Sequence, residues 1–198
     1  LLFVDCPPPE SHRELPFVTA DNYTASREVG AHLAAHGYRR WGFIGHTGTW
    51  TTRQPREQGF VDAAAACGAQ VAVIEGANDS DSARRAVLAH LSARPRPEWP
   101  EALYAANTPL LHGTMLALRE RGLRVPDDMA LVAFDDFEWA PMLDPPLTVV
   151  DQRIEEIGAA AGRQILLQLA EEPIPEAERA RIVRPVLRLR RSCGCRHG

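Results

Sequence analysis

Several side chains of this sequence have the chemistry needed to hold a small hydroxylated molecule. Arg56 presents a rigid fork of hydrogen-bond donors, and Asp135 directly follows the apolar segment 129–134. Binding of sugars and similar compounds uses planar polar groups of this kind together with aromatic faces. Trp50 and Trp139 could supply such faces, although aromatic residues more often belong to a core or to a rim. The candidate ligand-binding residues are Asp21, Trp50, Arg56, Asn107, Asp135, Trp139 and Gln152.

Most of these candidates also have a purely structural interpretation. Asp21 and Asn107 each precede a predicted helix, where an Asp or Asn side chain commonly caps the first turn. Arg56 could equally be a surface residue paired with an acidic neighbour. Of the adjacent Asp135 and Asp136, we favour Asp135 as a ligand contact and assign Asp136 to capping or to other structural contacts.

The segment Cys193-Gly194-Cys195-Arg196-His197 could bind zinc through two thiolates and one imidazole. Its spacing is not that of a standard zinc finger or knuckle, and the sequence shows no obvious fourth ligand. We therefore expect no metal site, and no motif requires a cofactor. The other cysteines, Cys6 and Cys67, are far apart, so the four do not form the disulfide framework of a small secreted protein. This cysteine usage is typical of a reduced, cytoplasmic protein.

The sequence offers little support for an enzyme. The Gly-containing segment 45–49 lacks the Lys and the spacing of a phosphate-binding loop. There is no Gly-x-Ser-x-Gly nucleophile motif. Asp135 and Asp136 are adjacent, so they need not face each other as an acid–base pair would. We predict a protein that is not an enzyme, with a hydrolase of the α/β type as the alternative.

Composition argues against two further classes. The net charge is −4 and all 22 basic residues are Arg, whereas a chain that binds nucleic acid by itself needs a concentrated basic face. No apolar run approaches the ~20 residues that span a bilayer, and the first residues do not have the pattern of a signal peptide. Because the sequence does not begin with Met, we expect it to be part of a longer protein.

The candidate residues are positioned by an alternation of strand-like and helical segments. The predicted strands are 41–44, 71–74, 102–105, 129–134, 147–150 and 182–189. The predicted helices cover residues 25–33, 56–67, 83–91, 111–118 and 154–165. This alternation indicates an α/β fold with parallel sheets flanked by helices. Ligands of such sheets bind beyond the carboxyl ends of the strands, so polar residues from separate strand ends would converge on one pocket.

Four motifs follow one another along nearly the whole chain. They are VTADNYTASREVGAHLAAHGYRRWGFIG from Val18, REQGF from Arg56, PEALYAANTPLLHG from Pro100, and GLRVPDDMALVAFDD followed by PPLTVVDQ. Together they resemble the effector-binding domain of the LacI/GalR family of bacterial regulators, and the last pair is the strongest match. The departures from the family pattern are Ala25 and Ala133 in place of Gly, Thr108 in place of an acidic residue and Val149 in place of Thr. Thr108 removes a charge near the expected pocket and leaves the effector class open.

The resemblance implies a periplasmic-binding-protein-like fold with two lobes, of which the N-terminal lobe is incomplete here. The partial N-terminal lobe would comprise residues 1–44 and 152–172. The C-terminal lobe would comprise residues 45–151 and 173–198. Three crossings between the lobes would form the hinge, with Gln152 at one of them.

The resemblance also implies a function. We expect the ligand-sensing domain of a LacI-type transcription regulator, whose sugar or related polar effector modulates operator binding by a missing N-terminal helix-turn-helix domain. Near-palindromic operators are matched by two-fold dimers, so we expect a homodimer and no membrane partner. Leu110, Leu111, Met115 and the segment 60–67 could contribute to the dimer, or could simply cover their own sheet.

Two other functions share this fold, because a fold does not determine a function. One is an extracytoplasmic sugar-binding protein that feeds a transporter, and a weaker one is a sensor domain fused to another signalling module. The upstream sequence distinguishes them, since a helix-turn-helix supports the regulator and a signal peptide the transport protein.

Overall fold

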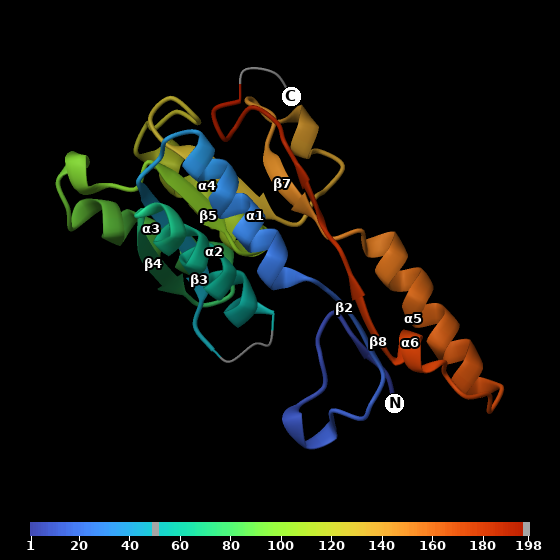
Figure 1. Ribbon diagram of the computed structural model, residues 1–198. Helices are drawn as coiled ribbons and strands as arrows, with labels where there is room; N and C mark the ends of the chain where they lie inside the picture. Colours follow the sequence, from blue (N-terminus) through green and yellow to red (C-terminus); the bar gives the residue numbers. More distant parts are fainter. Residues whose placement is uncertain (49–51, 196–198) are drawn as a thin grey trace.

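The computed structural model describes residues 1–48 and 52–195, which form two separate sheets (Figure 1). The smaller sheet has the strand order β1-β2-β8, with β1 Phe3–Val4, β2 Phe17–Ala20 and β8 Ala180–Val183. The larger sheet has the order β4-β3-β5-β6-β7-β9. Its strands are β3 Arg40–His46, β4 Gln70–Gly76, β5 Ala102–Ala105, β6 Ala130–Phe134, β7 Thr148–Asp151 and β9 Val186–Arg188. All pairs are parallel except β7 with β9, so the predicted α/β fold is confirmed.

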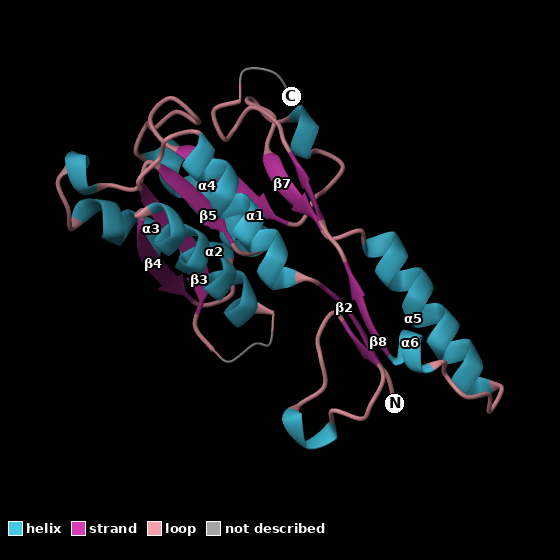
Figure 2. Cartoon of the chain, in the orientation of Figure 1, coloured by secondary structure: helices cyan, strands magenta, loops and turns pink. Residues whose placement is uncertain are grey.

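Helices connect the parallel strands (Figure 2). The α-helices are α1 Asn22–Ala35, α2 Arg53–Cys67, α3 Ser80–Ser92, α4 Thr108–Glu120, α5 Ile154–Leu169 and α6 Glu176–Arg179, with short 3-10 turns at Glu10–His12, Arg96–Glu98 and Ala140–Met142. α1 packs on α2 and α3 packs on α4. Crossovers between parallel strands are right-handed. The connection from β3 to β4 and the connection from β4 to β5 run in opposite directions across the sheet, so α2 and α3 lie on opposite faces of it.

The larger sheet carries most of the core. Its centre is aromatic: the ring of Phe60 on α2 lies 5.1 Å from that of Trp41 and 5.1 Å from that of Tyr104. A second, small apolar cluster joins α5 to the smaller sheet through Val18, Ile157 and other residues. Each sheet is therefore covered by its own helices. None of the helices in the described ranges has the length and apolarity required to cross a membrane.

The chain passes three times between the sheets, at 20–22, 151–154 and 183–186. The expected lobe boundaries lie between residues 44 and 45, 151 and 152, and 172 and 173, and the first and third of them do not coincide with a crossing between the sheets. α1 and β3 were expected in the N-terminal lobe, but β3 lies between β4 and β5, and α1 buries Val29 and Leu33 in the core of the larger sheet. β8 was expected in the C-terminal lobe, but it pairs with β2 of the smaller sheet.

The strand predicted over 182–189 is two strands in the structure, β8 and β9. Pro185 stands between them, and a proline has no N–H to continue a hydrogen-bonded ladder. The chain changes from the smaller to the larger sheet at this interruption, which Figure 1 shows as one long red run.

The apolar residues suggested for a dimer contact have a different role. Leu110, Leu111 and Phe60 are at most 1% exposed and belong to the core of the chain itself. Their side chains therefore cover their own sheet, and of the three apolar residues proposed on α4 only Met115 is partly exposed.

Candidate functional site

Arg56 is the centre of a polar site between α1, α2 and the larger sheet. It lies in the first turns of α2 and is only 5% exposed. Its Nε donates to Oδ1 of Asn22 at 2.7 Å, its Nη1 donates to the carbonyl of Ala106 at 2.7 Å, and its guanidinium carbon lies 3.5 Å from the ring centre of Phe134. These contacts fix the plane of the guanidinium, because a fork of donors stacked on an aromatic face has little freedom.

Asp135 follows β6 and joins several of the candidates. Its backbone has a positive φ of 83°, a conformation that residues with a side chain rarely adopt and that clusters at functional sites. One carboxylate oxygen accepts from the hydroxyl of Thr108 at 3.4 Å, and the other accepts from the side-chain amide of Gln152. The amide oxygen of Gln152 is buried and has no hydrogen-bond partner within residues 1–48 and 52–195. A buried acceptor without a partner is costly in a folded protein, so this group is suited to a ligand donor.

Asp5, at the end of β1, brings the smaller sheet to the same site. Its side chain is exposed, yet its pKa is raised, first by burial among surrounding atoms and then by the charge of Asp135, while Arg56 acts to lower it. Burial lowers the pKa of Arg56, and the nearby Tyr104, Asp135 and Asp5 oppose that shift.

Asp21 and Asn107 act as helix caps in the structure. Oδ1 of Asp21 accepts from the backbone N–H of Thr24 at 3.0 Å, and Oδ1 of Asn107 accepts from that of Leu110 at 3.1 Å. The residue of this first turn that reaches Arg56 is Asn22, not Asp21. The ligand contact predicted for Asp21 and Asn107 therefore stays a prediction, with the capping interpretation visible for both.

The two tryptophans differ in what can be said of them. Trp139 is 48% exposed, and its ring packs against that of Phe137 at a tilt of 38°, with 3.9 Å between the ring centres. Its described contacts thus tie it to Phe137 rather than to Arg56 or Asp135. Trp50 lies outside the described residues.

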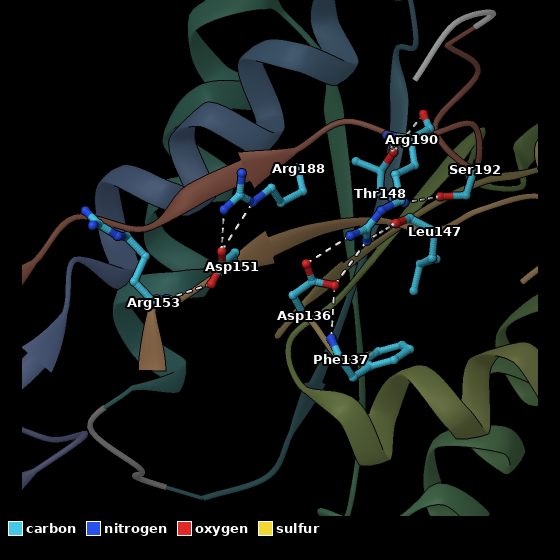
Figure 3. A network of polar contacts seen from close by, with 9 residues as sticks. All are labelled: Asp136, Phe137, Leu147, Thr148, Asp151, Arg153, Arg188, Arg190 and Ser192. Atoms are coloured by element: carbon cyan, nitrogen blue, oxygen red, sulfur yellow. Dashed lines mark hydrogen bonds and ion pairs between the residues drawn. The ribbon is translucent and has the colours of Figure 1, made fainter. Parts of the chain in front are cut away.

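Asp136 is held by Arg190 (Figure 3). Nη1 and Nη2 of Arg190 donate to its two oxygens at 3.1 and 2.9 Å, and the backbone N–H of Phe137 donates to it at 2.9 Å. Arg190 also donates to the carbonyl of Leu147 at 2.8 Å. These contacts agree with the structural role expected of Asp136.

Beside this ion pair lies a second one at the crossing, between Arg188 and Asp151, with 2.9 Å between Nη2 and Oδ2 (Figure 3). The two pairs line a hollow of about 920 Å³, together with Phe137 and the start of α5. Four of the charged residues of this lining, Asp136, Asp151, Arg188 and Arg190, are already paired with one another.

Three residues of the site, Asn22, Asp5 and Phe134, were not among the ligand-binding candidates predicted from the sequence. Asn22 and Asp5 had a visible signal, since each stands at the end of a strand-like segment, as the recognised Asp135 does. Phe134 had none, because an aromatic residue at the end of a buried strand is ordinary core.

The chain is similar to known regulators over most of its length. A family model described as a periplasmic binding protein-like domain matches residues 31–193. The HTH-type transcriptional repressor CytR of Escherichia coli is 29% identical over 168 residues, which cover 84% of this chain and 49% of that protein. The chain spans about half the length of the curated relatives it matches.

Solved structures give the same result. A regulatory protein of LacI family from Chloroflexus aggregans aligns with a TM-score of 0.83 and 26% identity, over 96% of this chain and 66% of that chain. The transcriptional regulator CelR, solved as a complex with cellobiose, aligns with a TM-score of 0.82 and 27% identity, over 94% of this chain and 57% of that chain.

Proposed function

The chain belongs to the LacI/GalR family of effector-binding domains with the periplasmic binding protein-like fold, and from this premise we propose that it is the ligand-sensing part of a transcription regulator. The observation that carries the proposal is the group of Asp5, Arg56 and Asp135, which interact through their charges but belong to different sheets. A molecule held by this group would favour one arrangement of the two sheets over another. That differential binding is what a sensor requires.

The proposed effector is a sugar or a related polyhydroxylated compound. Nε and Nη1 are the guanidinium nitrogens of Arg56 that have hydrogen-bond partners among the described residues, which leaves Nη2 for a ligand oxygen. The carboxylates of Asp5 and Asp135 accept from hydroxyls, and so does the unpartnered amide oxygen of Gln152. Its structural neighbour CelR was solved with cellobiose, a compound of this class.

The output of the sensor would lie outside this sequence. We propose that operator DNA is read by an N-terminal helix-turn-helix domain of the whole protein, as the names of the curated relatives indicate for those proteins. The net charge of −4 supports this division of roles, because the chain has no excess of basic residues for phosphate contacts. Operator binding would place the protein in the cytoplasm, and the repressor names of the relatives support a binding role rather than an enzymatic one.

The test is a thermal-shift screen of mono- and disaccharides and nucleosides, followed by calorimetry of the compound that stabilises the chain most. We expect Arg56→Lys to weaken binding of that compound about tenfold or more, since it loses a charge-assisted bond of about 1.5–3 kcal/mol. Arg84→Lys is the matched control, because Arg84 forms an exposed ion pair with Glu120 on α4. Equal affinities for a folded Arg56→Lys variant and the control would contradict the site.

We also propose that the whole regulator is a homodimer, since two-fold operators are matched by two-fold proteins. The core position of Leu110, Leu111 and Phe60 moves the contact to other surfaces. Met115 lines an apolar hollow of about 590 Å³ with Leu123, and it can still contribute, as can the exposed Ala65 and Ala66 of the segment 60–67. Light scattering of the whole effector domain at micromolar concentration checks this, and a monomer with and without effector would contradict it.

A further inference from the structure

Two histidines and two cysteines meet at the end of α1 that is remote from Arg56. His32 and His36 are one turn apart on α1, and Cys193 and Cys195 follow β9. One ligand atom from each residue lies within 4.8 Å of the ligand atoms of the other three. Two of these residues come from near the start of the chain and two from near its end, so the fold alone brings them together.

The distances match those of a four-coordinate metal site. The two Sγ atoms are 3.4 Å apart, Nε2 of His32 is 3.2 Å from Sγ of Cys193 and 3.8 Å from Sγ of Cys195, and Nε2 of His36 is 3.4 Å from Sγ of Cys195. Zinc bonds of about 2.3 Å to sulfur and about 2.0–2.1 Å to nitrogen, arranged as a tetrahedron, separate the ligand atoms by roughly 3.4–3.8 Å. Four of the six separations, at 3.2–3.8 Å, are within a few tenths of an ångström of this range, and the other two are at most 4.8 Å.

The surrounding residues hold the cysteines in this position. Gly194 has a φ of 97°, and a Cβ at this residue would lie 2.7 Å from the hydroxyl of Tyr38, so the turn between the cysteines requires glycine. The Tyr38 hydroxyl donates to the carbonyl of Cys193 at 3.2 Å, and the Thr148 hydroxyl donates to its Sγ at 3.0 Å. The turn is thus built by tertiary contacts that are independent of any ion.

We propose that His32, His36, Cys193 and Cys195 bind one Zn²⁺, which ties the segment after β9 to α1. Two thiolates and two imidazoles in a tetrahedral arrangement are the ligand set of structural zinc, and four protein ligands leave no open position for catalysis. Cys193 is fully buried whereas His36 is exposed, so the ion would enter from the side of His36.

The acid–base properties of the thiols agree with metal binding. Burial acts to raise the pKa of Cys193, but hydrogen bonds from His32 and Thr148 outweigh it and lower that pKa below its ordinary value. Burial and the neighbouring Cys193 raise the pKa of Cys195. An ion bound between the two sulfurs would supply the positive charge that stabilises both thiolates.

From the sequence alone we expected no metal site, because the segment 193–197 shows no fourth ligand. The missing ligands are His32 and His36, which lie 161 residues before Cys193 and 159 residues before Cys195. The expected third ligand, His197, lies outside the described residues and is not needed for the set of four. His32 and His36 are four residues apart at the end of α1, and this spacing is a recurrent arrangement for two histidines that share a metal.

The proposal is tested on the chain purified and kept with a reductant that does not bind metals. We expect inductively coupled plasma mass spectrometry to find one zinc per chain after incubation with Zn²⁺ and removal of the excess. Co²⁺ in place of Zn²⁺ should give the visible bands of a tetrahedral site and a thiolate-to-metal charge-transfer band. A chelator should lower the melting temperature of the zinc-loaded chain.

His36→Ala is the informative variant, since His36 is exposed and its loss leaves the buried Cys193 in place. Loss of a residue that only orients a ligand costs 10–100-fold in affinity, so loss of a ligand should weaken Zn²⁺ binding at least about 100-fold. Cys193→Ser, if it folds, should also lose the charge-transfer band. His90→Ala and Cys67→Ser are the matched controls, because both residues lie outside the cluster, and both variants should bind as the parent does.

Three outcomes would overturn the proposal. The first is a reduced chain with all thiols free that binds neither Zn²⁺ nor Co²⁺. The second is a chain whose mass and peptide map show a Cys193–Cys195 disulfide that persists in the reductant. The third is equal zinc affinity in His36→Ala and in the two controls, which would place the ion elsewhere.

Discussion

The side-chain amide of Gln152 donates a hydrogen bond to Oδ1 of Asp135. Asp135 follows β6 of the larger sheet, whereas Gln152 lies between β7 and α5, where the chain passes to the smaller sheet. A ligand that bonds to Asp135 therefore acts on a carboxylate that is joined directly to the crossing segment. This contact gives the proposed effector a short physical route to the relative position of the sheets.

We expect a measurable energetic coupling between Gln152 and Asp135 in effector binding. Groups that share a hydrogen bond usually couple by about 0.5–3 kcal/mol in a double-mutant cycle. The variants are Gln152→Met, Asp135→Asn and the double variant, and calorimetry with the selected compound gives the three affinities. Gln58 and Asp62 form the control pair, because their exposed hydrogen bond of 2.7 Å lies on the surface of α2. Additive losses at Gln152 and Asp135 would show that the crossing does not sense the carboxylate.

The neighbouring carboxylates Asp135 and Asp136 should respond differently to the same substitution. Asp135→Asn keeps a residue that tolerates positive φ, so it should weaken effector binding while the melting temperature changes little. Asp136→Asn breaks two charge-assisted bonds to Arg190, whose side chain is 16% exposed, and should cost roughly 1.5–3 kcal/mol of stability. Its effector affinity should stay near that of the parent. Thermal unfolding and calorimetry of both variants decide the matter, and a reversed pattern would exchange the two roles.

Much of the fold could be predicted because it rests on local patterns. Apolar runs of strand length followed by helical periodicity predict parallel strands joined by helices, and the structure confirms both. Helix ends were visible as well, since Gly68 ends α2 in the left-handed conformation that glycine favours. The crossings were harder to locate, because the apolar residues of 182–189 resemble a single strand, although Pro185 divides them and the chain changes sheet there.

The site was predictable only in part, because its contacts join distant segments. Arg56 and Asp135 have distinctive chemistry at recognisable positions. Asn22, in contrast, holds Arg56 through a bond between residues 34 positions apart. That bond depends on how closely α1 approaches α2, which no local pattern encodes. The four-residue cluster at the far end of α1 was invisible for the same reason.

Asp5 should give the chain a small destabilisation that depends on pH. Its pKa is raised above the ordinary 3.8 by burial, so ionisation of Asp5 is less favourable in the folded than in the unfolded chain. Stability from this group is fully present below its unfolded pKa and is lost as the pH rises through the folded pKa. Asp5→Asn should therefore have a slightly higher melting temperature than the parent at pH 7. The gain in the free energy of unfolding should be less than about 1 kcal/mol, because the side chain is exposed.

The difference between Asp5→Asn and the parent should shrink as the pH falls toward 4. Melting curves of both chains between pH 4 and pH 7, in about 0.15 M salt to limit long-range effects, measure it. Glu10→Gln serves as the control, since Glu10 is exposed and forms only a local ion pair with Arg13. A parent that melts above Asp5→Asn throughout this range would mean that the attraction of Arg56 outweighs burial.

Gly59 sets the distance between α1 and α2 and thereby the bond from Arg56 to Asn22. A Cβ at Gly59 would lie 2.2 Å from the carbonyl oxygen of Tyr23, which is backbone and cannot turn aside. Gly59→Ala must therefore push α1 away from α2 and should cost about 1–3 kcal/mol of stability, as overpacking does. The same displacement should weaken effector binding, because Asn22 is the first residue of α1 and would move with that helix.

Gly162→Ala on α5 is the control, and the opposite effect is expected for it. Nothing lies within 4 Å of the Cβ position of Gly162, so the alanine should stabilise the helix by about 0.5–1 kcal/mol. Urea unfolding and calorimetry of the two variants measure both effects, and a Gly59→Ala chain as stable as the parent would show that the helix contact is not rigid.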